Sequence, residues 1–216
     1  MRSVYFLTMH RAASSYMAEN MKTARHLRLQ DYAGQIYRGE TPKLEFKEEG
    51  YIYGPLRYTT DSHSPVWPMI QMAINNIKDH KAIFMVRNPI DHLASWYHIV
   101  REKHSLSPVK RIAETQLVER ELCKEGLQVY LEYKAQQTAT RYGMFIKLYE
   151  ACPKGVLFRY EDMVRNPAQF RDEVGEHIQM KWGPITNTST RYIIPEQIQG
   201  KLQEIFRPVM HYLNYQ

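Results

Sequence analysis

The stretch Val4-Tyr5-Phe6-Leu7-Thr8-Met9-His10-Arg11-Ala12-Ala13-Ser14-Ser15-Tyr16-Met17 predicts a buried strand, a tight turn of small residues and then a helix. Free backbone N–H groups at a helix N-terminus point outward, and the helix dipole favours negative charge there. The arginine of the turn adds a fixed positive charge, and the two serines add hydroxyl donors. The two small alanines let a ligand approach the backbone. The stretch therefore predicts an anion site, although serine is also a common N-cap.

The same stretch is not a P-loop of the nucleoside-triphosphate type. That pattern requires G-x-x-x-x-G-K-[ST], whereas the chain has no glycine before Gly34 and no lysine before Lys22. The stretch therefore argues against nucleoside-triphosphate binding and leaves the anion site standing.

The length and composition predict one globular domain over residues 1–216. A chain of 216 residues with 44% hydrophobic side chains can bury a sizeable α/β core. Its two cysteines, Cys123 and Cys152, are too few for a disulfide framework and form no C-x-x-C pair. We therefore expect no structural metal and a reducing compartment.

The net charge of +6 suggests an acidic ligand, but the charges are too scattered to predict nucleic-acid binding. The apolar run at Val4–Met9 is too short for a signal peptide and is followed by Arg11. No apolar run approaches the roughly 20 residues of a membrane span. We expect a cytoplasmic protein without a membrane span.

Three continuous apolar runs predict buried parallel strands at Val4–Met9, Ala82–Val86 and Val156–Tyr160. A helix-start signal follows each run at once. This order predicts an α/β fold of three layers, in which helices flank a central, mostly parallel sheet. Ligands of such sheets bind at the carboxyl ends of the strands, where we expect Arg11 and Arg87 to lie, together with Tyr160.

Apolar residues at spacings of three and four predict core-facing helices over 66–77, 131–149 and 198–213. The glycine- and proline-containing stretch Gly34–Asp61 predicts loops with one or two minor strands. The charged stretch Lys103–Gly126 predicts a helical or mobile surface segment.

A second motif runs from Arg87 to His98 and reads R-N-P-I-D-H-L-A-S-W-Y-H. Its arginine ends a strand, and Ser95 follows eight positions later, about two helical turns on. The two side chains can together hold one phosphate, although an ordinary Asn-Pro helix start with a surface arginine gives the same pattern. The third motif, Tyr160-Glu161-Asp162, is weak alone because acidic residues commonly begin helices.

Together the three motifs resemble the cytosolic-type sulfotransferases, which use 3′-phosphoadenosine 5′-phosphosulfate (PAPS). His10–Tyr16 resembles the family's phosphosulfate loop, roughly P-K-S-G-T-T-W, in which many bacterial members have arginine for lysine. The segment that begins at Arg87 matches R-[ND]-P-x-D-x-x-x-S-x-Y, and the segment that begins at Tyr160 matches Y-E-D-x-x-x-x-P. The resemblance covers about residues 2–17, 60–100 and 155–170.

The resemblance implies a P-loop nucleotide-hydrolase-like sulfotransferase fold and a metal-independent enzyme. Such an enzyme moves a sulfuryl group from PAPS to a hydroxyl or amine of a small-molecule or carbohydrate acceptor. Arg11 is then catalytic and the cofactor-binding residues are Arg11, Ala12, Ala13, Ser14, Ser15, Tyr16, Arg87, Ser95 and Tyr160.

The resemblance also nominates a general base. Family members carry T-H-x-P some two dozen residues before the motif arginine, and here His63 in Ser62-His63-Ser64-Pro65 lies 24 positions before Arg87 (87 − 63 = 24). Histidine is suited to accept a hydroxyl proton near neutral pH. Asp61 and His10 are the competing candidates.

The chain departs from the family pattern in two places. Ala13 replaces the usual loop glycine, which is tolerable only if that residue avoids a positive φ. The C-terminal R-K-G-x-x-G segment, which helps to hold the 3′-phosphate, is absent. A basic cluster offers a substitute, or else a solvated face or an acceptor patch: Arg101, Lys103, His104, Lys110 and Arg111.

Two other classes of function remain open from the sequence. One is an ATP- and magnesium-dependent phosphotransferase, which the missing Lys-[Ser/Thr] pair disfavours. The other is a non-catalytic anion- or nucleic-acid-binding protein, whose binding would depend strongly on salt. The sequence predicts neither the acceptor nor the oligomeric state.

Overall fold

A computed structural model describes residues 2–9, 11–37, 40, 43–59, 61–62, 64, 66–102, 106, 110–184 and 193–215. The chain divides into two compact units, which are described separately below. The first comprises Met1–Arg87 and Phe145–Thr188, and the second comprises Asn88–Met144 and Ser189–Gln216. That residues 1–216 form a single domain stays a prediction.

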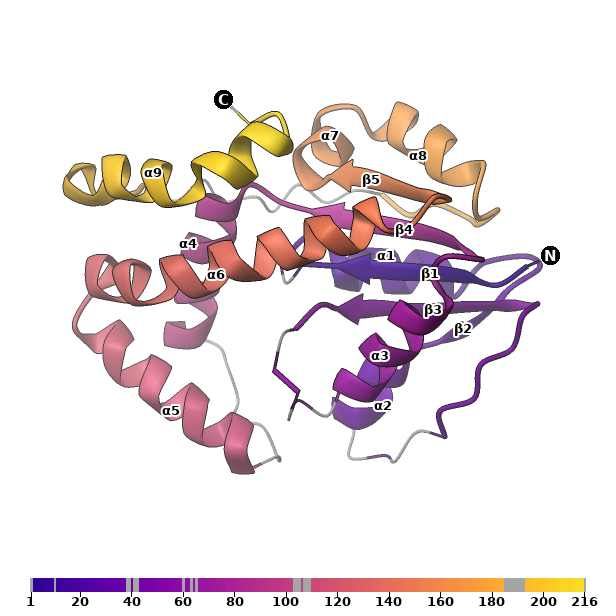
Figure 1. Cartoon of the computed structure of the whole chain (residues 1–216), viewed down its shortest axis with the longest axis horizontal. Coiled ribbons are helices and arrows are strands. Elements are labelled where there is room, and N and C mark those ends of the chain that lie inside the picture. Colours follow the sequence, from indigo (N-terminus) through magenta and orange to yellow (C-terminus); the bar gives the residue numbers. More distant parts are fainter. Residues whose placement is uncertain are drawn as a thin grey trace. The chain divides into compact units, whose positions relative to one another are not determined.

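The first unit is built on a five-stranded parallel sheet of order β2-β3-β1-β4-β5 (Figure 1). The strands are β1 (Val4–Thr8), β2 (Arg28–Gln30), β3 (Tyr51–Arg57), β4 (Lys81–Val86) and β5 (Gly155–Arg159). The three strands expected from apolar runs are present as β1, β4 and β5, and they are neighbours in the sheet. The predicted α/β fold with a parallel central sheet is therefore confirmed.

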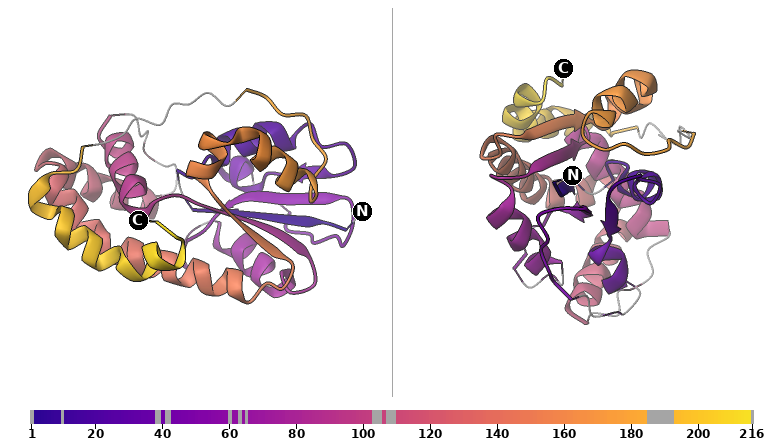
Figure 2. Two further views of the ribbon diagram at one scale, coloured as in Figure 1. Left: turned by 90° about the horizontal axis from the view of Figure 1, so that it is seen from above. Right: turned by 90° about the vertical axis from the view of Figure 1, so that its right-hand side faces the viewer.

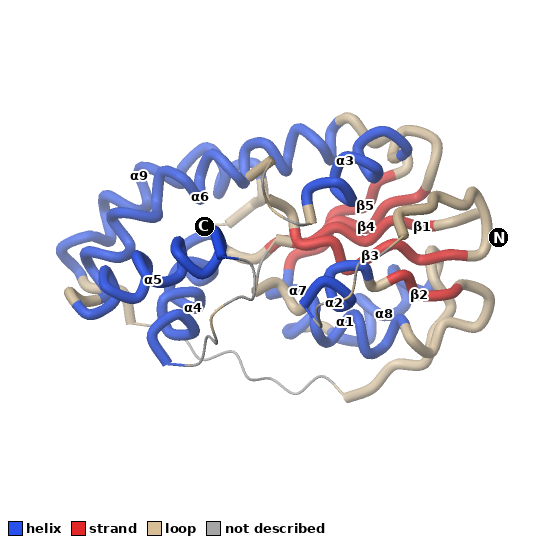
Figure 3. The backbone as a smooth tube through the Cα atoms, turned by 90° about the horizontal axis from the view of Figure 1, so that it is seen from below, coloured by secondary structure: helices blue, strands red, loops and turns tan. Residues whose placement is uncertain are grey.

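Helices cover both faces of this sheet, as Figure 3 shows. The helices of this unit are α1 (Ser14–Met21), α2 (Tyr32–Tyr37), α3 (Trp67–Asn76), α7 (Tyr160–Arg165), α8 (Pro167–Gly175) and the last turns of α6 (Leu127–Glu150). On one face, α1, α7 and α8 pack against Phe6 and Met85. On the other, Phe84 contacts Phe145 of α6, with ring centroids 5.4 Å apart. Burial from both sides explains why the strands read as continuous apolar runs.

The strand β3 corrects the expectation of minor strands in Gly34–Asp61. It has seven residues and lies between β2 and β1, with its five central residues buried. Gly54 and Pro55 hid it, because proline cannot donate to the ladder and glycine usually marks a turn. Here Gly54 has φ 146° and lies so close to β1 that a Cβ would stand 2.4 Å from the carbonyl oxygen of Phe6. Only glycine fits this close approach.

The second unit contains α4 (Pro89–Glu102), α5 (Lys110–Lys124), most of α6, and α9 (Glu196–Tyr212), which runs along α6 (Figure 2). Its core includes Leu93, Tyr97, Tyr130, Leu131, Leu202 and Phe206. A buried ion pair joins Lys134 of α6 to Glu119 of α5, and Trp96 Nε1 donates to Glu119 Oε2 over 3.1 Å. The helices expected over 131–149 and 198–213 are confirmed, and the charged stretch is helical from Lys110.

Neither cysteine is placed for chemistry. Cys123 and Cys152 are both buried and free. Burial raises the pKa of the Cys123 thiol to about 11 and also raises the pKa of the Cys152 thiol. Both are therefore protonated near neutral pH and are poor nucleophiles. Within the described helices, none is long and apolar enough to cross a membrane.

Candidate active site

The carboxyl ends of β1, β4 and β5 bring three of the predicted residues together. Arg87 follows β4, is only 7% exposed, and donates from Nη1 to the carbonyl oxygen of Arg11 over 3.4 Å. Its guanidinium carbon lies 4.8 Å from the centroid of the Tyr160 ring, a cation–π contact. Because these strands are neighbours and parallel, residues 76 and 73 positions apart meet at one edge of the sheet.

The loop between β1 and α1 holds two residues in the left-handed region. Arg11 has φ 62°, and Ala13, the N-cap of α1, has φ 58°. The condition set from the sequence, that alanine is tolerable here only without a positive φ, is therefore wrong. The tight turn is secured instead by its backbone hydrogen bonds, from Ala12 N–H to the carbonyl of Met9 and from Met17 N–H to that of Ala13. Left-handed backbone costs a residue with a Cβ roughly 1–2 kcal/mol, and such strain is typical of functional loops.

We expect the substitution Ala13→Gly to raise the free energy of unfolding by about 1 kcal/mol, because glycine adopts this φ without a steric penalty. Urea denaturation of the unmodified protein and of the Ala13→Gly variant measures this difference. Ala12→Gly is the matched control: Ala12 is fully buried and has no positive φ, so the change there should destabilise the fold. Equal losses for the two variants would contradict the assigned strain.

The strand that the sequence hid also contributes to the site. Arg57, the last residue of β3, donates from Nε to the Oγ of Ser14 over 3.2 Å. Ser14 begins α1 and is buried, whereas Ser15 is exposed beside it. Sequence reasoning missed Arg57 because β3 was taken for a minor strand. An arginine directly after an apolar run, as at Arg87, was the signal that could have found it.

Tyr16 packs under a segment that follows α8, residues 179–184, which we call the strap. The Tyr16 hydroxyl donates to the carbonyl of Gly183 over 3.0 Å. Its ring lies nearly parallel to that of Trp182, at 24° and with centroids 6.5 Å apart. The Lys181 N–H donates to Thr23 Oγ1 over 2.8 Å, so the strap follows α1 along its length.

Asn20 joins the strap to α1 through the hydrogen bonds of its side chain. It is only 5% exposed; its Nδ2 donates to the Tyr16 carbonyl over 2.7 Å, and its Oδ1 accepts from Gly183 N–H over 2.6 Å.

We expect Asn20→Ala to lower the free energy of unfolding by about 1–3 kcal/mol, because it leaves part-buried backbone groups without these bonds. Thermal unfolding measures it. Lys22→Ala, an exposed site after the same helix, should change stability by less than about 0.5 kcal/mol; similar effects at both sites would refute the bridging role.

The Tyr160-Glu161-Asp162 motif divides into two roles. Tyr160 faces Arg87, whereas Asp162 receives two hydrogen bonds from Arg159, over 2.6 Å at Oδ2 and 2.9 Å at Oδ1. Asn166 then caps α8, because its side chain accepts from the Gln169 N–H. The tyrosine of this motif therefore contacts the candidate site, while Asp162 pairs with Arg159.

Two further residues of the second motif belong to α4 and to its N-terminal cap. Asn88 caps α4, since its Oδ1 accepts from the N–H of Ile90 over 3.0 Å and of Asp91 over 3.3 Å. Ser95 is 1% exposed on α4 in the second unit, and its pairing with Arg87 stays a prediction.

The candidate bases and the basic cluster are only partly described. His63 and His10 lie outside the described residues, while Asp61 is exposed just after β3. Of the basic cluster, Arg101 and Lys110 are exposed; Lys103, His104 and the side chain of Arg111 lie outside the described part of the chain. No group of three His, Cys, Asp or Glu side chains that could hold a metal ion occurs among the described residues.

Residues 53–186 match the sulfotransferase domain family. The chain belongs to this family. A solved sulfotransferase from Alicyclobacillus acidocaldarius is similar over 99% of this chain and 94% of its own, with 15% identity and a TM-score of 0.52. Mouse sulfotransferase SULT7A1, solved in complex with PAP, is similar over 97% of this chain and 85% of its own, with 12% identity and a TM-score of 0.57. At these identities the likeness shows a shared fold. No curated protein matches the chain.

Proposed function

We propose that this sulfotransferase moves the sulfuryl group of PAPS to a hydroxyl or amine and releases adenosine 3′,5′-bisphosphate (PAP). The observation that carries the proposal is the position of Arg87, between the ring of Tyr160 and residues 10–16, which we call the donor loop. A planar, permanently charged guanidinium at the carboxyl edge of a parallel sheet suits bidentate binding of a phosphate. The PAP complex of the mouse neighbour supports the same nucleotide class.

The donor loop holds the 5′-phosphosulfate in this proposal. Backbone N–H groups of the first turn of α1 point at the anion, together with the hydroxyls of Ser14 and Ser15. The side chain of Arg11 is exposed, and in this proposal it reaches the oxygen that bridges the sulfur and the 5′-phosphate of PAPS. Arg87 and Ser95 hold the 3′-phosphate.

The rings of Tyr16 and Trp182 are suited to hold the adenine. The two rings lie at 24° with centroids 6.5 Å apart, and aromatic faces of this kind stack on a nucleotide base. Tyr160 lines the other side of the adenosine.

The chemical step is an in-line displacement at sulfur. His63 accepts the acceptor's proton while the acceptor oxygen or nitrogen forms a bond to sulfur. The bond between sulfur and the bridging oxygen breaks, and its electron pair leaves with the 5′-phosphate. Arg11 stabilises the negative charge that develops on that oxygen. This scheme assigns no step to a metal ion.

A calorimetric titration of the full chain tests the nucleotide assignment. PAP should bind more tightly than adenosine 5′-monophosphate, which lacks the 3′-phosphate, and more tightly than ATP with magnesium. Tighter binding of ATP with magnesium would favour a phosphotransferase. No heat from PAP at millimolar concentration would overturn the proposal.

Replacing Arg87 with alanine should raise the Kd for PAP by about 10- to 100-fold, because a charged hydrogen bond is worth about 1.5–3 kcal/mol. The affinity for adenosine 5′-monophosphate should change far less, so the preference between the two nucleotides collapses. Arg28→Ala, at an exposed arginine at the start of β2, is the control and should leave both affinities unchanged. An unaltered PAP affinity in Arg87→Ala would show that Arg87 does not bind the 3′-phosphate.

A further inference from the structure

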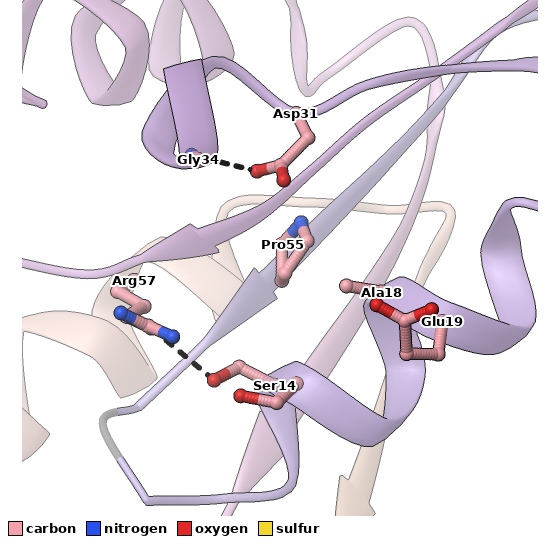
Figure 4. Close-up of a pocket in the computed structure, with 8 residues that line it drawn as sticks. Ser14, Ala18, Glu19, Asp31, Gly34, Pro55 and Arg57 are labelled. Atoms are coloured by element: carbon pink, nitrogen blue, oxygen red, sulfur yellow. Dashed lines mark hydrogen bonds between the residues drawn. The ribbon is translucent and has the colours of Figure 1, made fainter. Parts of the chain in front are cut away.

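A pocket of about 180 Å³ lies beside the donor loop, between α1, the residues that follow β2, and the end of β3 (Figure 4). Its polar lining comes from Ser14, Ser15, Glu19, Asp31 and Arg57. The two serines also belong to the proposed phosphosulfate loop. An acceptor in this pocket therefore lies next to the sulfuryl group that it would receive.

The walls of the pocket offer both donors and acceptors of hydrogen bonds. Arg57 and the serine hydroxyls donate from one side, and Figure 4 shows the carboxylates of Asp31 and Glu19 on the others. Asp31 Oδ1 accepts from the Gly34 N–H over 2.9 Å, but a carboxylate has about four acceptor positions. The mixed lining is complementary to hydroxyl groups, since each hydroxyl both donates and accepts.

The pocket is poorly suited to a flat apolar acceptor. Of the described residues that line it, none is aromatic. An apolar ring would also remove the carboxylates and the guanidinium from water without replacing their hydrogen bonds, which costs roughly 1–3 kcal/mol for each group. The pocket volume of about 180 Å³ is enough for a small ring.

We infer that this pocket is the acceptor subsite and that it takes a small polyhydroxylated group, such as a sugar or cyclitol ring. The inference rests on the proposed function, because it places the acceptor against the donor loop. Asp31 and Glu19 accept hydrogen bonds from the ring hydroxyls, and Arg57 and Ser15 donate to them. The hydroxyl nearest the loop is the nucleophile.

Transfer from PAPS to D-glucose, D-glucosamine and myo-inositol, compared with 2-naphthol, tests this inference on the full chain. We expect transfer to at least one of the three polyols and a lower kcat/KM for 2-naphthol. Ala18→Leu fills the pocket and Asp31→Asn removes a charge while an oxygen remains to cap the Gly34 N–H; each should lower kcat/KM for the polyol about tenfold or more. Arg25→Leu, at an exposed residue a few positions after the same helix and outside the pocket, is the matched control and should leave kcat/KM unchanged.

Three results would overturn the inference: a preference for 2-naphthol, polyol transfer that neither variant alters, or no transfer to any polyol. Calorimetry with PAP on each variant separates these results from failure of the proposed function. A protein that binds PAP and gives one of them refutes the acceptor subsite alone. A protein that does not bind PAP refutes both proposals.

Discussion

Replacing Arg11 with glycine is expected to lower kcat for sulfuryl transfer by about 10²–10³-fold, the usual cost of removing a group that stabilises charge in the transition state. Glycine is the informative substitution because Arg11 has φ 62°. It removes the guanidinium without adding backbone strain, and it keeps the carbonyl that receives the hydrogen bond from Arg87. Arg11→Lys keeps a positive charge and should retain part of the activity.

Single-turnover measurements with saturating PAPS separate this effect from nucleotide binding. The Kd for PAP should rise only a few-fold in Arg11→Gly, because most contacts to the nucleotide come from other residues. Its free energy of unfolding should not fall, since a strained position has been relieved. An unchanged kcat would show that Arg11 does not act on the leaving oxygen.

The parts of the fold that were predictable are those whose sequence pattern is local. The strands β1 and β4 are buried on both faces and the edge strand β5 is half-buried, so their apolar runs are continuous and their bounds follow within one residue. The strand β3 was misread because Gly54 and Pro55 interrupt it, and both are explained only by the neighbouring strand. Its close approach to Phe6 is a tertiary contact that no window of sequence contains.

The same distinction applies to the site. The sequence could place Arg11, Arg87 and Tyr160 at one edge because each lies at or shortly after the carboxyl end of an apolar strand, and β1, β4 and β5 are neighbours in the sheet. The contacts of Arg57 with Ser14 and of Trp182 with Tyr16 could not be predicted, because each joins segments that are distant in the sequence. The strap has no regular period, so its attachment to α1 is set by side-chain-to-backbone bonds that sequence spacing does not encode.

The loop shows that alanine can occupy a left-handed position. Glycine adopts such a φ without a steric penalty, whereas Ala13 adopts φ 58° here. The penalty of roughly 1–2 kcal/mol is small against the packing of a fully buried Ala12 and the helix that follows. A substitution that looked incompatible with the backbone was therefore compatible with the fold.

Replacing His63 with alanine is expected to lower kcat/KM by about 10²–10⁴-fold, the contribution of a general base. PAP affinity should stay the same, because the base acts on the acceptor. A base must be unprotonated to accept a proton, so the activity of the unmodified enzyme should fall at acidic pH. In His63→Ala this loss of activity at acidic pH, the acidic limb of the pH profile, should disappear. The residual activity should then rise with hydroxide concentration.

The two competing bases provide the controls. Asp61→Asn and His10→Ala should each keep both the acidic limb and most of the activity, since neither residue accepts the proton in the proposed scheme. If Asp61→Asn instead loses activity as strongly as predicted for His63→Ala, and His63→Ala keeps its pH profile, the base is the carboxylate and the proton leaves from the end of β3. That result would assign the proton transfer to another residue. The proposed roles of the arginines, the nucleotide and the direction of sulfuryl transfer would stay unchanged.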